Sequence, residues 1–327
     1  MSMTADQIVD RRRMRRKLSF WRVTGFVALI LLIVAGAALF SGRDAFPLIA
    51  TPQIARISIS GFITDDRAQT QLIERLAETD AVSGVIVAID STGGATTGGE
   101  SLYVALRKLA EAKPTVATVG TFGASAAYMA AIATDHIVAR RTSITGSIGV
   151  IFQYPEVSEL LEKLGVAVED IKSAPLKAEP SPFKPTSEEA RRVIAGIVKD
   201  SFDWFVDIVA ERRGMLRGEA VALADGRIYT GQQALGAKLI DEIGGEDEAV
   251  AWLATKGVDD KLPVKDWKPR RDTGVFSYTD AALLWIAKRM GLSPDLLPAG
   301  LLDRFLPESL KLDGLLSVWQ ASSGRGP

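Results

Sequence analysis

Residues 115–131 read TVATVGTFGASAAYMAA, and this stretch decides which fold to expect. Residues 115–119 have the composition of a short strand, and the alanine-rich residues that follow favour a helix. Ser125 stands between the two, near the exposed N–H groups and the positive dipole end of the predicted helix. At such a turn a serine hydroxyl and a backbone donor can act on the same carbonyl group. Because serine is also a common helix cap, a buried, serine-capped helix of small residues is the alternative.

Strand-like and helix-like segments alternate along the chain on both sides of this turn. Residues 54–60 (IARISIS) alternate as a half-buried strand does, whereas residues 85–89 (VIVAI) form an apolar run typical of a strand covered on both faces. We expect helices at residues 70–79 and 100–112, and a further strand at residues 137–139. This order predicts an α/β domain. Gly93 and Gly94 follow the second strand, where backbone N–H groups can approach a ligand closely.

The composition limits the possible chemistry. The chain of 327 residues is 47% hydrophobic and 24% charged, with a net charge of −1, which indicates a globular protein and gives no sign of a nucleic-acid partner. It has no cysteine, which excludes thiol catalysis and Cys-ligated zinc. Its one histidine, His136, cannot build a two-histidine metal site, and we expect neither a metal nor a cofactor. A catalytic serine would therefore depend on His136 or on a lysine as its base.

The N-terminal region predicts a membrane anchor. Residues 11–22 (RRRMRRKLSFWR) are strongly basic, and residues 23–40 contain no charged side chain. That length is at the short end of the roughly 17–25 residues that a spanning helix needs. Basic residues before the span favour a cytoplasmic N-terminus, which places the rest of the chain on the outer, periplasmic face of the cytoplasmic membrane. A signal peptide cleaved near residues 35–37 (AGA) is the alternative, and both interpretations export most of the chain.

Several short motifs occur in a characteristic order: DSTGG at 90–94, GASAAY at 123–128, TGSIGV at 145–150, IKSAPLK at 171–177, ADGRIYTG at 224–231 and DEIGG at 241–245. Their order and spacing resemble those of the signal peptide peptidase A family of membrane-bound serine proteases. The resemblance covers the anchor and residues 54–257, and it implies a ClpP/crotonase-like spiral of ββα units. Two sites depart from the family pattern: Thr92 replaces a proline, and Ala126 and Ala127 replace glycines.

The resemblance implies a Ser-Lys dyad with Ser125 as the nucleophile and Lys177 as the general base. It gives Ser147 the task of positioning the lysine, and we expect an oxyanion hole formed by the N–H groups of Gly93 or Gly94 and of Ala126. Residues 174–176 and 178 are small or apolar, and burial among them would favour the neutral amine that a base requires.

By the same resemblance, the substrates are hydrophobic peptides left in the membrane after signal-peptide cleavage. A membrane-tethered scaffold of the same fold without catalysis is the alternative, and the two alanines are its support. Acyl-CoA chemistry, which crotonase-type folds also host, is a third interpretation, and the external location argues against it.

We expect the chain to be organised as a basic cytoplasmic segment (1–22), a transmembrane anchor (23–40), a linker (41–53), a protease domain (54–257) and a C-terminal extension (258–327). Residues 186–189 (TSEE) form a capping-box pattern that starts a long helix. The extension begins as a linker and carries amphipathic helical pieces at 281–287 and 315–319, which would lie on the membrane or on a neighbouring subunit. No motif is repeated, so the resemblance to short family members implies a homo-oligomeric ring in which neighbours share Ser125 and Lys177.

Overall fold

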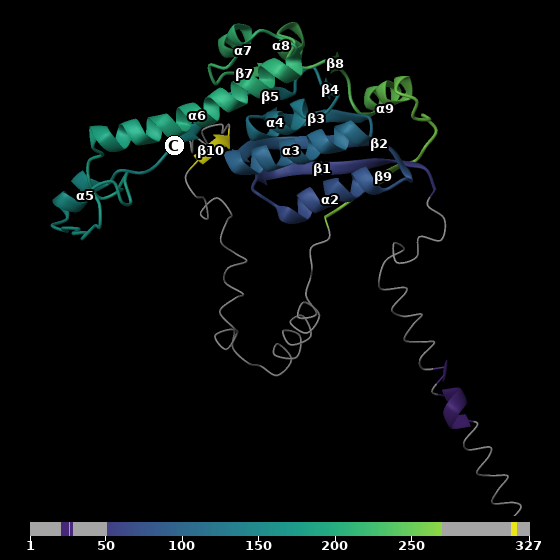
Figure 1. The fold of residues 1–327 in the computed structure, drawn as a ribbon, viewed down its shortest axis with the longest axis horizontal. Coiled ribbons are helices and arrows are strands. Elements are labelled where there is room, and N and C mark those ends of the chain that lie inside the picture. Colours follow the sequence, from purple (N-terminus) through teal and green to yellow (C-terminus); the bar gives the residue numbers. More distant parts are fainter. Residues whose placement is uncertain (1–20, 26, 29–50, 270–314, 319–327) are drawn as a thin grey trace, which may run out of the picture. The chain divides into compact units, whose positions relative to one another are not determined.

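The computed structural model describes residues 21–25, 27–28, 51–269 and 315–318 (Figure 1). The chain divides into an N-terminal unit that ends at Thr51 and a compact unit that begins at Pro52. Most of the predicted anchor at residues 23–40 lies outside the described residues. Within those ranges, none of the helices combines the length and the apolar character that a membrane span requires.

The second unit is built on one ten-stranded sheet. Six strands run parallel to their neighbours, in the order β9 (Val264–Asp266), β1 (Gln53–Ile63), β2 (Val82–Ala95), β3 (Thr115–Ala124), β4 (His136–Ala139) and β8 (Glu242–Ile243). The other four extend the sheet where β2 and β3 end, and they are β5 (Ile144–Gly146), β6 (Ile151–Phe152), β7 (Ile228–Thr230) and β10 (Leu315–Val318). The predicted α/β class is confirmed.

The helices alternate with these strands. They are α2 (Arg67–Glu78), α3 (Thr96–Ala112), α4 (Ala126–Ile132), α5 (Ser158–Lys163), α6 (Glu188–Arg213), α7 (Arg217–Leu223), α8 (Gly231–Gly236) and α9 (Glu246–Thr255). Helix α2 begins earlier than its apolar spacing suggests because the Asp66 carboxylate accepts hydrogen bonds from the backbone N–H groups of Ala68 and Gln69. The long helix α6 is capped by Ser187, whose hydroxyl accepts from the Ala190 N–H at 3.1 Å. The N-cap of α6 is therefore Ser187, the second residue of the predicted capping box at residues 186–189.

Alternating side chains of the central strands face two separate cores. Val85, Val87 and Ile89 lie in the larger core with α2, α3 and α4, whereas Ile86 lies in a smaller core with residues of α9. All four side chains are at most 1% exposed. The unbroken apolar run at residues 85–89 therefore reflects burial on both faces, as predicted.

Two segments of the C-terminal region differ from expectation. Val264–Asp266, predicted to lie in a linker, forms β9 and pairs with β1 in parallel. Leu315–Val318, predicted to be part of an amphipathic helical piece on the membrane or a neighbouring subunit, forms the strand β10, which pairs with β2 and β6 of its own chain. Both segments cover sheet edges whose N–H and C=O groups would otherwise lack partners in the sheet, and helical periodicity does not reveal such pairing.

Candidate active site

Ser125 lies at the junction of β3 and α4, and its backbone has φ 59° and ψ −122°. This positive φ is rare for a residue with a side chain and costs about 1–3 kcal/mol. The residue is only 1% exposed, and its side chain makes no capping hydrogen bond to α4. Ser125 is thus the N-cap residue of a fully buried helix, as in the alternative interpretation, but it does not cap that helix through its side chain. A sharply strained serine between a strand and a helix is instead the geometry of a nucleophile elbow.

Strand β5 holds this strained turn in place. The Ser125 N–H donates to the Gly146 carbonyl at 2.8 Å, and β5 pairs in parallel with the end of β3. Next to it, the Thr145 hydroxyl donates to the Gly123 carbonyl at 2.7 Å. On the helix side, the Ser125 carbonyl accepts from the N–H groups of the first turn of α4, so both sides of the turn are fixed by backbone bonds.

Strand β7 supports the loop that carries Ser147. The Ser147 N–H donates to the Arg227 carbonyl at 2.8 Å, and Gly146 pairs with Ile228 in the antiparallel β5–β7 ladder. Gly146 has φ +81°, and a Cβ there would lie 2.5 Å from the Tyr229 ring. Ser147 itself has φ 50° and is 7% exposed. The motif at residues 224–231 therefore forms the support of both serine turns, which its sequence alone does not reveal.

The glycine pair of β2 reaches the same end of the sheet. Ser91 of β2 pairs with Gly123 of β3, and Gly93 and Ser125 each follow that pair by two residues along the chain. Gly93 has φ +111°, and its N–H donates to the Ser91 hydroxyl at 3.1 Å. A Cβ on Gly94 would lie 2.0 Å from the Ile63 carbonyl oxygen, so only glycine fits there. The structure thus brings three of the predicted segments to this end of the sheet, those of Gly93 and Gly94, of Ser125 and Ala126, and of Ser147.

Lys177 lies elsewhere, in the arm, which we define as residues 153–186. Every hydrogen bond and ion pair that this described segment makes joins two of its own residues, among them Lys172 with Glu179 at 2.6 Å and Tyr154 with Thr186 at 2.7 Å. Lys177 is exposed, as are residues 174–176 and 178. In a single chain these neighbours do not bury the amine, because none of the described elements covers this part of the arm.

Comparison with known proteins identifies the family. Residues 107–259 match peptidase family S49. A putative protease of Synechocystis sp., slr0021, is 36% identical over 252 residues, which are 75% of this chain and 90% of that protein. A putative signal peptide peptidase SppA of Enterococcus faecium is 35% identical over 213 residues, 61% of this chain and 62% of that protein. The chain belongs to peptidase family S49.

This S49 chain is a serine peptidase, in agreement with the family suggested by its motifs. Among solved structures, a membrane-bound stomatin-specific protease is similar with a TM-score of 0.46 and 15% sequence identity, over 68% of this chain and 100% of that one.

His136 is not placed to serve Ser125 in this S49 peptidase. It pairs with Val116, nine residues before Ser125 at the opposite end of β3, which corresponds to roughly 30 Å at the rise of an extended strand. Its ring stacks on Trp252 with the centroids 4.9 Å apart, and its Nε2 lies 3.2 Å from the Glu242 carboxylate. The only histidine of the chain is therefore a packing residue between β4, β8 and α9.

Ala126 and Ala127 fit the fold without narrowing the turn. Both are fully buried, and Ala126 is the first residue of α4. A Cβ placed on Gly99 of α3 would lie 3.0 Å from the Ala126 methyl group. The methyl therefore faces α3, in space that the absence of a side chain on Gly99 leaves open.

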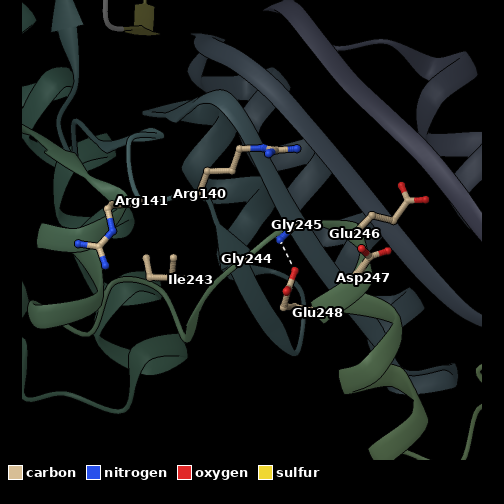
Figure 2. A pocket seen from close by; sticks show the side chains of 8 residues that line it. All are labelled: Arg140, Arg141, Ile243, Gly244, Gly245, Glu246, Asp247 and Glu248. Carbon is tan, nitrogen blue, oxygen red and sulfur yellow. Dashed lines mark hydrogen bonds between the residues drawn. The ribbon is translucent and has the colours of Figure 1, made fainter.

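One hollow of the described surface is separate from these segments. It lies at the start of α9 and is lined by Arg140, Arg141 and residues 243–248 (Figure 2). The Glu248 carboxylate accepts from the Gly245 N–H at 2.6 Å, which caps the helix. None of the predicted site residues lines this hollow.

A further residue that sequence reasoning missed is Asp90, whose carboxylate accepts hydrogen bonds from the N–H groups of Thr121 and Phe122 and shapes the end of β3.

Proposed function

We propose that this S49 serine peptidase is a membrane-anchored endopeptidase that cleaves hydrophobic peptides with Ser125 and Lys177. The strained backbone of Ser125 is the observation that carries the proposal. A buried serine held in a backbone conformation that costs free energy is typical of a catalytic site. The proposal includes the membrane anchor, an active site on the outer face of the cytoplasmic membrane, and cleaved signal peptides as substrates. It also includes the finer description of the fold as a ClpP/crotonase-like spiral.

The reaction follows from these roles. Ser125 Oγ attacks the peptide carbonyl while the neutral Lys177 amine takes the hydroxyl proton. The resulting oxyanion accepts hydrogen bonds from the Ala126 N–H and from Gly93 or Gly94. Collapse expels the amine of the leaving peptide, which takes its proton from Lys177, and leaves an acyl-enzyme. A water molecule deprotonated by Lys177 then releases the acid product and frees Ser125.

An isolated chain supplies only part of this machinery. Ser125 is buried in the sheet unit, whereas Lys177 is exposed in the arm and surrounded by water. A water-exposed lysine is almost entirely protonated near neutral pH and is a poor base. We therefore propose a homo-oligomeric ring in which the Lys177 of one chain reaches the Ser125 of its neighbour and becomes buried there.

The surface of the arm supports this assembly. The arm lies with α5 at the end of α6 remote from α7 (Figure 1). Large apolar side chains are exposed along the arm and the first half of α6: Leu160, Leu164, Val166, Val168, Ile171, Leu176, Phe183, Val193 and Ile197. Exposed apolar side chains in such number mark an interaction surface, and a second copy of the chain is the partner that would also complete the site.

The scaffold alternative loses its main support. It rests on the two alanines that replace glycines, yet the Ala126 methyl faces Gly99 in α3 and the residue keeps the N–H that an oxyanion needs. We therefore favour an active enzyme.

The catalytic roles are tested by substitution. Ser125→Ala should abolish both peptide hydrolysis and labelling by a fluorophosphonate probe. Lys177→Ala should lower kcat by about 10²–10⁴-fold, the usual contribution of a general base. Lys163→Ala, at another exposed lysine of the arm, is the matched control and should keep full activity. Activity retained in Lys177→Ala but lost in folded His136→Ala would overturn the Ser-Lys assignment.

The shared site is tested by mixing inactive chains. Ser125→Ala and Lys177→Ala chains are co-expressed with different tags, and the oligomers that contain both are isolated. If neighbours share the site, some interfaces pair an intact serine with an intact lysine, and part of the activity returns. If each chain builds its own site, every site lacks one partner. No recovery in oligomers shown to be mixed would refute the shared site.

The proposed topology is tested with a reporter fused after Pro327. A periplasm-dependent reporter should be active there, and a cytoplasm-dependent one inactive. The reverse result would contradict the topology, and a mature N-terminus near Ala38 would favour a cleaved signal peptide over an anchor.

A further inference from the structure

The loop that carries Lys177 is closed at its base by an ion pair. The loop runs from Lys172 to Glu179, and the Lys172 ammonium lies 2.6 Å from one Glu179 carboxylate oxygen. The other Glu179 oxygen accepts a hydrogen bond from the Ser181 N–H at 3.2 Å, which fixes the carboxylate from a second side. The ion pair therefore holds together the two ends of the segment that presents the proposed base.

Two tight turns shape the loop around Lys177. The Lys177 N–H donates to the Ala174 carbonyl at 3.1 Å. The Glu179 N–H donates to the Leu176 carbonyl at 3.3 Å. Ala178, next to the proposed base, has φ 61°, a left-handed conformation that persists in alanine only where surrounding contacts hold it. The direction of the Lys177 side chain depends on these turns, because each fixes the backbone beside it.

Charged groups rather than apolar packing hold this part of the arm. None of the residues of the arm, all of which the structure describes, is buried, so the arm has no apolar core of its own. Lys172 and Glu179 have side chains that are 18% and 16% exposed, whereas every other charged residue of the arm is classed as exposed. The ion pair is thus the best-covered charged contact in the arm, and it lies at the base of the loop with the proposed base.

A second carboxylate reinforces the ion pair. One oxygen of Asp170 lies 2.9 Å from the Lys172 ammonium, and the other pairs with Lys184. Hydrogen bonds to Glu179 and to Asp170 raise the pKa of Lys172. The hydrogen bond from Lys172 lowers the pKa of Glu179 in return. Both groups are therefore charged and paired at neutral pH.

We propose that Lys172 and Glu179 are positioning residues for Lys177, and that their ion pair keeps the loop closed so that the amine reaches Ser125 in one arrangement. The inference rests on the proposed function, in which Lys177 is the general base. A base acts only from hydrogen-bond distance of the hydroxyl that it deprotonates, and small misplacements cost much of the rate. In an arm without a core, the ion pair supplies the order that packing supplies elsewhere.

The kinetic test compares Lys172→Met and Glu179→Gln with the parent chain. Each removes one charge of the pair and should lower kcat about fivefold, with KM within about twofold, because neither group touches the substrate. Lys172→Arg keeps the charge and should retain most of kcat. Arg217→Met is the matched control, since it breaks ion pairs with Asp203 and Asp207 outside the arm and should match the parent. Unchanged kcat in both altered chains would refute the inference and leave the proposed function intact.

A double-mutant cycle separates positioning from a general loss of structure. Labelling of Ser125 by a fluorophosphonate probe is followed in Lys172→Met, in Lys177→Ala and in the chain with both changes. If Lys172 acts through Lys177, its removal slows labelling of the parent about fivefold and does not slow labelling of Lys177→Ala further. Equal slowing in both backgrounds would mean that Lys172 supports the arm or the assembly in general, and the inference would fail. Full labelling of Lys177→Ala would overturn the proposed function itself.

A third measurement does not depend on catalysis. In a Ser125→Ala background, amide hydrogen exchange is followed in peptides that cover residues 172–181, which include the hydrogen-bonded amides of Lys177 and Glu179. Exchange there should be about fivefold faster in Lys172→Met and unchanged in the control Arg217→Met. Equal exchange in Lys172→Met and its parent would show that the ion pair does not hold the loop, whatever the activity of the chain.

Discussion

Replacement of Ser125 by glycine measures the strain stored at the proposed nucleophile. Removing a side chain to leave glycine normally destabilises a protein, because glycine loses more backbone freedom on folding, at a cost of roughly 0.5–1 kcal/mol. Loss of a buried methyl group adds about 0.8 kcal/mol. At Ser125 these losses are opposed by relief of the positive φ, which costs about 1–3 kcal/mol in a residue with a side chain.

The strain is measured by comparing the free energies of unfolding of Ser125→Ala and Ser125→Gly, because both variants lack the hydroxyl group. The opposing contributions nearly cancel, so the free energy of unfolding should stay the same within about 1 kcal/mol or rise. Ala117→Gly provides the control, since Ala117 is fully buried in β3 away from the turn. That variant should lose about 1.5 kcal/mol relative to the parent chain. The difference between the two sites, about 2 kcal/mol, is the strain.

The assay is urea unfolding followed by tryptophan fluorescence, with every chain in the same detergent and at one protein concentration because the protein is expected to assemble. Both Ser125 variants should be inactive. If Ser125→Gly is less stable than Ser125→Ala by as much as Ala117→Gly is less stable than the parent, the backbone at Ser125 is not strained and the main support for a nucleophile elbow is lost.

Three further predictions follow from the described contacts. Gly146→Ala should lower the free energy of unfolding in urea by about 1–3 kcal/mol more than Gly226→Ala does. Both glycines have φ +81°, but only at Gly146 would the new methyl group clash with a tyrosine ring. Equal losses of stability would contradict that contact. The Lys184 ammonium, with a second lysine, lowers the pKa of Asp170 from 3.8 to about 2, so its ion pairs are present at neutral pH and are lost as the pH falls from about 4 to about 2. Relative to an unfolded reference peptide, pepsin should cut the arm faster as the pH falls across that interval, and this increase should be smaller in Asp170→Asn. His136→Ala should leave kcat unchanged in folded protein, because His136 lies at the far end of β3, and a large loss of kcat would indicate a histidine base.

Local sequence patterns predicted the α/β class and the central elements of the sheet unit correctly. The alternation at residues 54–60 and the apolar run at 85–89 became β1 and β2, and the strand–turn–helix reading around Ser125 became β3 and α4. These patterns succeed because side-chain periodicity records which faces of a strand or helix are buried. Motif order also indicated the family, which the comparison with known proteins shows.

Only the tertiary structure decided what surrounds Ser125. Its positive φ depends on the Gly146 carbonyl, and the Ser147 turn depends on Arg227, a residue distant in sequence. The pairing of β10 with β2 is likewise a contact between distant segments, and Lys177 is exposed because none of the described elements lies over it. Composition and periodicity describe the neighbours of a residue along the chain, whereas strain, edge pairing and solvation are set by the neighbours that folding brings through space. The sequence therefore determined the family and most of the central elements. The fold determined how the proposed nucleophile is held, which strand pairs with the end of β2, and that the described part of the chain leaves the proposed base uncovered.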